Sequence, residues 1–136
     1  MKYNFEQQYE HIGYLFYGLV KREGRITATD LLKLSEFVDT TWKPVASGDP
    51  ALSVHLAECV HRGIRFASTN AMTTAHALES FKMYFIMHAL GFGGTLRERI
   101  LDSVHTLRKG FMGSPEVDKI EEDLKRLFAL PAVSSN

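Results

Sequence analysis

Apolar residues recur every three or four positions along most of the chain, which is the spacing of a single helix face. In the first segment this face comprises Phe5, Tyr9, Ile12, Phe16, Leu19 and Val20. The helix is predicted to end near Gly24, because glycine tolerates the positive φ of a helix C-cap. A second helix is predicted after Thr27, which can form a capping box with Asp30 three residues on. Its apolar face comprises Leu31, Leu34 and Val38.

The middle of the chain predicts two more helices. Residues 43–50 hold two prolines and a Ser-Gly-Asp cluster, which indicates a loop. A third helix is predicted over residues 50–62, and it either ends at Gly63 or continues with a kink toward Ala67. A fourth helix, over residues 74–90, is apolar most of the way round. This pattern is typical of a central helix, so we expect the fourth helix to be the most buried.

Two further helices complete the prediction. Thr95 and Glu98 have the spacing of a capping box that opens a fifth helix. Residues 114–116, Ser-Pro-Glu, open a sixth with a cap, a proline in the first helical position and an acid in the first turn. No segment alternates with period two. The sequence therefore predicts an all-α fold, a compact single-domain bundle of about six helices over residues 1–130, with a flexible tail at 131–136.

Charge and cysteine usage narrow the function class. The 136 residues carry 16 basic and 16 acidic side chains, so no overall field draws the chain to nucleic acid or to an anionic membrane. Cys59 is the sole cysteine, which excludes an intramolecular disulfide and favours a reducing compartment. Residues 1–7 are too polar for a signal peptide, and the longest apolar run, residues 83–90, is too short to span a bilayer. We expect a cytoplasmic protein without nucleic-acid or membrane partners.

One junction resembles a known family. Residues 15–30 contain an apolar helix followed by Arg22-Glu23-Gly24-Arg25-Ile26-Thr27 and then Asp30. This stretch resembles the signature of the TerB-like family, small helical proteins linked to tellurite resistance. That signature has an acid and a glycine, an apolar residue, a Ser/Thr cap, and a second acid three residues on. The family typically has Asp first and Glu second, so this chain exchanges them. Residues 113–120 also resemble a later family turn into an acidic helix.

The resemblance implies an all-helical fold, a role in a stress or metal-related response, and a divalent cation held by the acidic residues near the turn, here Glu23 and Asp30. The residues themselves also fit a different explanation. A hard cation such as Ca²⁺ takes six to eight oxygen ligands, and these two carboxylates supply few. A C-cap glycine followed by a capping box accounts for the same residues without any ligand.

Histidines and glutamates offer a second candidate metal site. Glu58 and His61 lie three residues apart on the third helix, and His76 and Glu79 have the same spacing on the fourth. Residues three apart share a helix face, so each pair can point at one space. Glu58-x-x-His61 fits one element of the di-iron carboxylate bundles, which need two such elements. The pattern is compatible with a mononuclear zinc or iron site, although solvated surface side chains are the commoner reason for such pairs.

Other candidate chemistry is sparse. Cys59 is expected to lie on the apolar side of its helix as a small hydrophobic residue without a histidine partner. Gly91–Thr95, followed by Arg97, could hold an anion at a helix N-terminus, but turn chemistry explains it better. Tyr14 and Tyr17 lie off the first apolar face. They favour an exposed aromatic patch suited to self-association or a partner, but packing of a second face of the helix against another helix explains them equally well.

These observations favour a non-catalytic helical module that acts through protein–protein contacts or as a homodimer in a stress or metal-related response. The alternative is a metal-binding helical protein with a His/Glu site for zinc or iron. A hydrolase or transferase that uses Cys59 is a third hypothesis, so whether the protein is an enzyme stays open.

Overall fold

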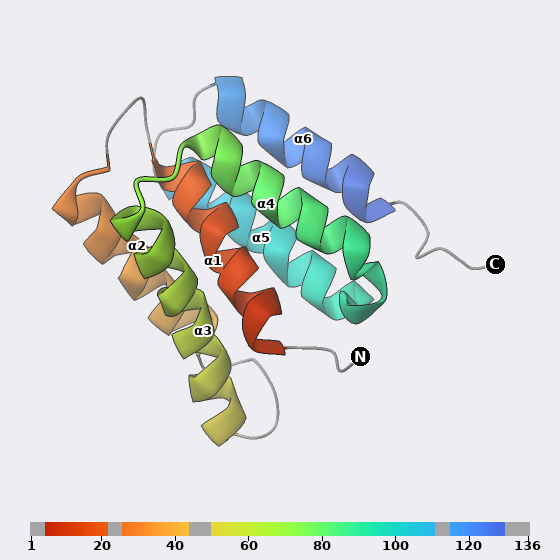
Figure 1. Ribbon diagram of the computed structural model, residues 1–136, viewed down its shortest axis with the longest axis horizontal. Coiled ribbons are helices and arrows are strands. Elements are labelled where there is room, and N and C mark those ends of the chain that lie inside the picture. The colour runs from red at the N-terminus through yellow and green to blue at the C-terminus, as the bar shows by residue number, and fades with distance from the viewer. Residues whose placement is uncertain (1–4, 22–25, 44–49, 111–114, 130–136) are drawn as a thin grey trace. The chain divides into compact units, whose positions relative to one another are not determined.

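The computed structural model describes residues 5–21, 26–43, 50–110 and 115–129, and these are helical with short connections (Figure 1). The elements in chain order are α1 Phe5–Val20, α2 Ala28–Thr41, α3 Pro50–Thr69, α4 Thr74–Met87, a 3₁₀ turn η1 Ala89–Gly91, α5 Gly94–Gly110 and α6 Pro115–Ala129. No strand occurs in these ranges. The all-α prediction with six helices is confirmed.

The chain divides into two packing units, Met1–Tyr84 and Phe85–Asn136, which are described separately. A single domain over residues 1–130 stays a prediction. Several predicted features lie outside the described residues: the C-cap at Gly24, the loop before Pro50, the cap at Ser114 and the tail at 131–136.

In the first unit, α1 packs along α3. The buried side chains of this unit include Ile12, Leu15 and Phe16 of α1, Leu34 and Val38 of α2, and Val60 and Ala67 of α3. The expectation that α4 is the most buried helix is wrong. It is α1 that is buried along most of its length, whereas Met83, Ile86 and Met87 of α4 are exposed. Only part of the apolar surface of α4 is therefore buried.

Two glycines let α1 and α3 approach closely. A Cβ atom on Gly13 would clash with the backbone carbonyl oxygen of Val60, and one on Gly63 would clash with the backbone of Glu10. The sequence predicts an end or a kink at Gly63, but α3 continues through it to Thr69. The absence of a side chain at Gly63 serves the contact between helices. The close contact fixes the position of α1 relative to α3, and with it the positions of the side chains that flank the contact.

Helix α2 is held at both ends. At its start, Thr27 Oγ1 accepts a hydrogen bond from the Asp30 N–H at 3.0 Å, and the Thr27 N–H donates to Asp30 Oδ2 at 3.3 Å. The predicted capping box is thus confirmed. At its end, Trp42 is buried, with its ring edge-on to Tyr9 at 6.0 Å and to Phe16 at 5.7 Å between centroids. These contacts anchor α2 to α1.

The second unit is built around an aromatic cluster. The Phe85 ring lies 4.9 Å from Phe92 and 4.8 Å from Phe128 between centroids. Helix α5 begins at Gly94, so Thr95 already lies inside the helix and does not precede it as the predicted capping box requires. Between α5 and α6, the buried carboxylate of Glu121 lies 2.9 Å from Arg108 Nε and 3.3 Å from His105 Nδ1. This ion pair joins α5 to α6.

Candidate metal centre

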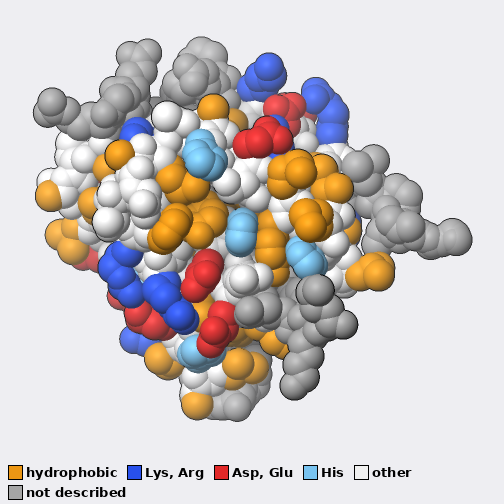
Figure 2. Space-filling model, in the orientation of Figure 1, with side chains coloured by type: hydrophobic (Ala, Val, Ile, Leu, Met, Phe, Trp, Pro, Cys, Tyr) orange, Lys and Arg blue, Asp and Glu red, His pale blue; other side chains and the backbone are white. Residues whose placement is uncertain are grey.

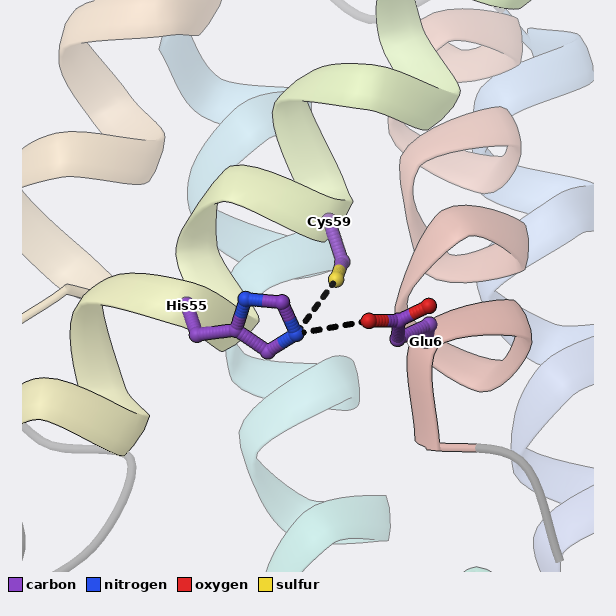
Figure 3. Close-up of side chains that lie close together, drawn as sticks. All are labelled: Glu6, His55 and Cys59. Carbon is purple, nitrogen blue, oxygen red and sulfur yellow. Dashed lines mark hydrogen bonds and ion pairs between the residues drawn. The ribbon is translucent and has the colours of Figure 1, made fainter.

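Three side chains capable of binding a metal ion converge between α1 and α3 (Figure 3). His55 Nε2 lies 2.9 Å from Glu6 Oε2 and 3.9 Å from Cys59 Sγ. The carboxylate oxygen, the imidazole nitrogen and the sulfur all lie within 4.8 Å of one another. No other group of three or more such residues occurs in the described part of the chain.

Helix geometry explains why these side chains meet. His55 and Cys59 are four residues apart, so they lie one above the other on the same face of α3. Glu6 belongs to the first turn of α1, where a carboxylate is also favoured by the helix dipole. The close approach at Gly13 and Gly63 brings that turn alongside α3.

The centre is open to water on one side. The side chains of Glu6 and His55 are 49% and 48% exposed, whereas Cys59 is fully buried. The sulfur therefore forms the inner end of the site, and the carboxylate and imidazole form its rim. Figure 2 shows acidic, basic and histidine side chains next to one another on the lower part of the face over α1 and α3.

The Arg62 guanidinium links the sulfur to a second carboxylate. Arg62 Nη2 donates a hydrogen bond to Cys59 Sγ at 3.2 Å, and Arg62 Nη1 lies 3.6 Å from Glu10 Oε2. Burial raises the pKa of the Cys59 thiol, and the Arg62 guanidinium only partly opposes this effect. At neutral pH the thiol is therefore protonated, which disfavours a nucleophilic role for Cys59.

The ligand set suits a zinc ion. Tetrahedral Zn²⁺ binds thiolate, imidazole and carboxylate at about 2.0–2.3 Å, which places neighbouring ligand atoms roughly 3.3–3.8 Å apart. The separations of His55 Nε2 from Glu6 Oε2 and Cys59 Sγ, 2.9 and 3.9 Å, lie on either side of this range, and the carboxylate oxygen and the sulfur lie within 4.8 Å of each other, so the side chains would rotate to bind one ion. The expectation that Cys59 has no histidine partner is wrong, because His55 precedes it by one helical turn.

The described residues of the two sites predicted from the sequence lie elsewhere. Glu23 is outside the described residues, and Asp30 completes the capping box of α2. The Glu58 carboxylate accepts from Arg65 at 3.1 Å, and His61 Nε2 lies 2.8 Å from Asp39 Oδ1.

The N–H of His76 donates to Thr73 Oγ1 near the start of α4, and Glu79 is exposed on the same helix. None of the five predicted residues that the structure describes belongs to the group that converges around Cys59. The structure therefore supplies no shared geometry for either predicted site among the described residues.

Of the two interpretations of Tyr14 and Tyr17, packing of a second helix face is the one that the structure supports. Tyr17 is buried and packs against Ala67, Met72 and Ala77. Tyr14 is half-buried, and its ring lies 4.8 Å from His11 and 5.8 Å from Phe66 between centroids. These tyrosines therefore contribute to packing within the first unit.

Comparison with known proteins gives no relative: no family model matches the chain, and neither does any curated protein or solved structure. Membership of the TerB-like family stays a prediction. Within the described residues, none of the helices has both the length and the apolar character needed to cross a membrane.

Proposed function

We propose that this protein is a metal-binding helical module that takes up one Zn²⁺ ion through Glu6, His55 and Cys59. The observation that carries the proposal is the convergence of three different ligand atoms within 4.8 Å of one another. The module acts by binding the ion, since a buried thiol with a raised pKa does not favour covalent catalysis by Cys59.

The donor types favour zinc over the hard cations. Ca²⁺ and Mg²⁺ prefer sites made of oxygen ligands, whereas a thiolate and an imidazole suit Zn²⁺. This set also differs from the carboxylate-rich site of di-iron bundles. The TerB-like resemblance of residues 15–30 also implies a role in a metal-related response, but it assigns the metal to different residues.

We expect chelator-treated, tag-free protein to bind Zn²⁺ with one-to-one stoichiometry in a competition titration against a chromophoric chelator. Co²⁺ should give a thiolate-to-metal charge-transfer band in the near ultraviolet, because sulfur is a ligand. Cys59→Ser should remove the band, and His55→Ala should weaken Zn²⁺ binding about 100-fold or more.

The matched control is His76→Ala, which removes an exposed histidine outside the group and should leave binding unchanged. Wild-type protein that binds no Zn²⁺, or a Cys59→Ser variant that binds it as tightly as wild type, would contradict the proposal.

A second candidate function is self-association, which the second unit favours through exposed apolar residues. Ile86 and Met87 lie at the end of α4 and Leu90 lies in the 3₁₀ turn that follows it, and their exposed fractions are 60%, 70% and 82%. The partner that we propose is a second copy of this chain. With 16 basic and 16 acidic side chains, two copies carry no net repulsion.

Sedimentation velocity at increasing concentration should show a dimer at tens of micromolar, a range typical of modest interfaces. Met87→Lys should shift the protein toward monomer, because a charge at the contact must be desolvated. Leu32→Lys, on α2 of the first unit and 61% exposed, is the matched control. A monomer at every concentration would exclude self-association.

A further inference from the structure

A fourth residue and a cation border the proposed zinc site. Glu10 lies one helical turn after Glu6 on α1, just as Cys59 lies one turn after His55 on α3. The guanidinium of Arg62 bridges the two helices, with Nη2 at 3.2 Å from Cys59 Sγ and Nη1 at 3.6 Å from Glu10 Oε2. One positive group thus contacts both the sulfur and a second carboxylate.

We propose that Glu10 is the fourth ligand of a closed, four-coordinate Zn²⁺ centre, and that Arg62 holds the place of the cation until the metal binds. This inference rests on the proposed function of Glu6, His55 and Cys59. In the structure, Arg62 engages Glu10, which lies outside the converging group of three. When Zn²⁺ binds, the guanidinium leaves Cys59 Sγ and the Glu10 carboxylate turns to the metal.

The exposure of the side chains permits this exchange. The Arg62 side chain is 44% exposed, so its guanidinium can move into water while its stem stays on α3. The Glu10 side chain is 25% exposed and lies against the same guanidinium that contacts the buried sulfur, so its carboxylate can approach the metal along that side of the site. A glutamate side chain can make this movement by changing rotamers, with the backbone of α1 fixed.

The exchange also balances charge. Two carboxylates, the Arg62 guanidinium and a thiol carry a total of one negative charge. Two carboxylates and a thiolate around Zn²⁺ carry the same total. The S–H bond of Cys59 breaks, its proton passes to water, and the sulfur forms a bond to the metal. One divalent cation therefore replaces one guanidinium and one proton.

A closed site has a functional consequence. Zinc held by four protein ligands is typical of structural sites, whereas catalytic zinc keeps a position for water or substrate. Glu10 as a ligand would make this centre a storage, sensing or structural site. It would leave no position for a substrate on the metal.

The test compares Zn²⁺ affinities of the full-length chain in the same chelator competition. Glu10→Gln should weaken binding about tenfold or more, because a neutral amide is a poorer ligand for Zn²⁺. Arg62→Gln should tighten binding about tenfold, because the competing cation is gone. Tighter binding is a result that a merely structural role of Arg62 would not give. Arg65→Gln is the matched control. It removes a guanidinium paired with Glu58 on the same helix and should leave the Zn²⁺ affinity unchanged.

Thermal melting of the metal-free variants shows whether each is folded, and Arg62→Lys provides a second variant that retains the charge. The lysine variant should leave the affinity closer to wild type than the glutamine variant does. If Cys59→Ser and His55→Ala lose binding while Glu10→Gln and Arg62→Gln match wild type, the inference fails and the three-ligand site stands. If the wild type binds no Zn²⁺, both fail.

Discussion

Alanine at Gly63 is expected to destabilise the first unit strongly and to weaken Zn²⁺ binding at the same time. The added Cβ would overlap the backbone oxygen, carbon and Cα of Glu10, and none of these atoms can move without shifting α1. Overpacking of this kind costs typically about 1–3 kcal/mol, and contacts with backbone belong at the upper end. The higher helix propensity of alanine returns only about 1 kcal/mol.

Chemical denaturation followed by circular dichroism measures the change in the free energy of unfolding. Zinc affinity should fall with it, because Glu6 lies on one helix and His55 and Cys59 lie on the other. Gly94→Ala is the control, since nothing lies within 4 Å of a Cβ at that position. Wild-type stability of Gly63→Ala would show that α1 and α3 do not approach as closely as described.

The role of Gly63 could not be predicted from the sequence. Glycine inside an apolar helical pattern indicates a cap or a kink from local rules alone. Its role as a contact point depends on Glu10, which is more than fifty positions away in the chain. The helix period and the Thr27–Asp30 capping box involve only neighbours within four residues, so these could be predicted from the sequence.

One part of the candidate site could be predicted from the sequence, and another part could not. The spacing of His55 and Cys59 is one helical turn, and this signal is present in the sequence. Glu6 is 49 residues from His55, and only the packing of α1 on α3 reveals that the two meet. The pairs Glu58/His61 and His76/Glu79 have equally good spacing. Asp39, which belongs to α2, nevertheless lies against His61, and periodicity along α3 does not show this contact.

The predicted turn before α5 shows how one arginine can have two interpretations. A glycine-rich turn followed by Arg97 has the composition of an anion site. In the structure the guanidinium of Arg97 donates to three backbone carbonyl oxygens. These belong to Phe92 at 2.7 Å, Phe128 at 2.7 Å and Ala89 at 3.1 Å. The N–H groups of Arg97 therefore donate to the backbone of the second unit. This supports the interpretation of residues 91–95 as a turn and not as an anion site.

Arg97→Ala is accordingly expected to loosen the second unit by about 2–4 kcal/mol. Hydrogen bonds to a charged group contribute about 1.5–3 kcal/mol each, and partial exposure of Arg97 lets water replace some of them. The guanidinium also lies 4.9 Å from the centre of the Phe85 ring, so the variant loses a cation–π contact. Phe128 lies on α6, so the end of that helix should lose its tie to α5.

Hydrogen exchange measured by mass spectrometry should show faster exchange at residues 89–100 and 124–129 in Arg97→Ala. Arg97→Lys should recover little, because one ammonium cannot reach three diverging carbonyls. Arg126→Ala is the matched control in the same unit, since its side chain is 75% exposed and its pair with Asp123 is a surface pair. Unchanged exchange in Arg97→Ala would mean that the aromatic cluster of Phe85, Phe92 and Phe128 holds the unit together without the arginine.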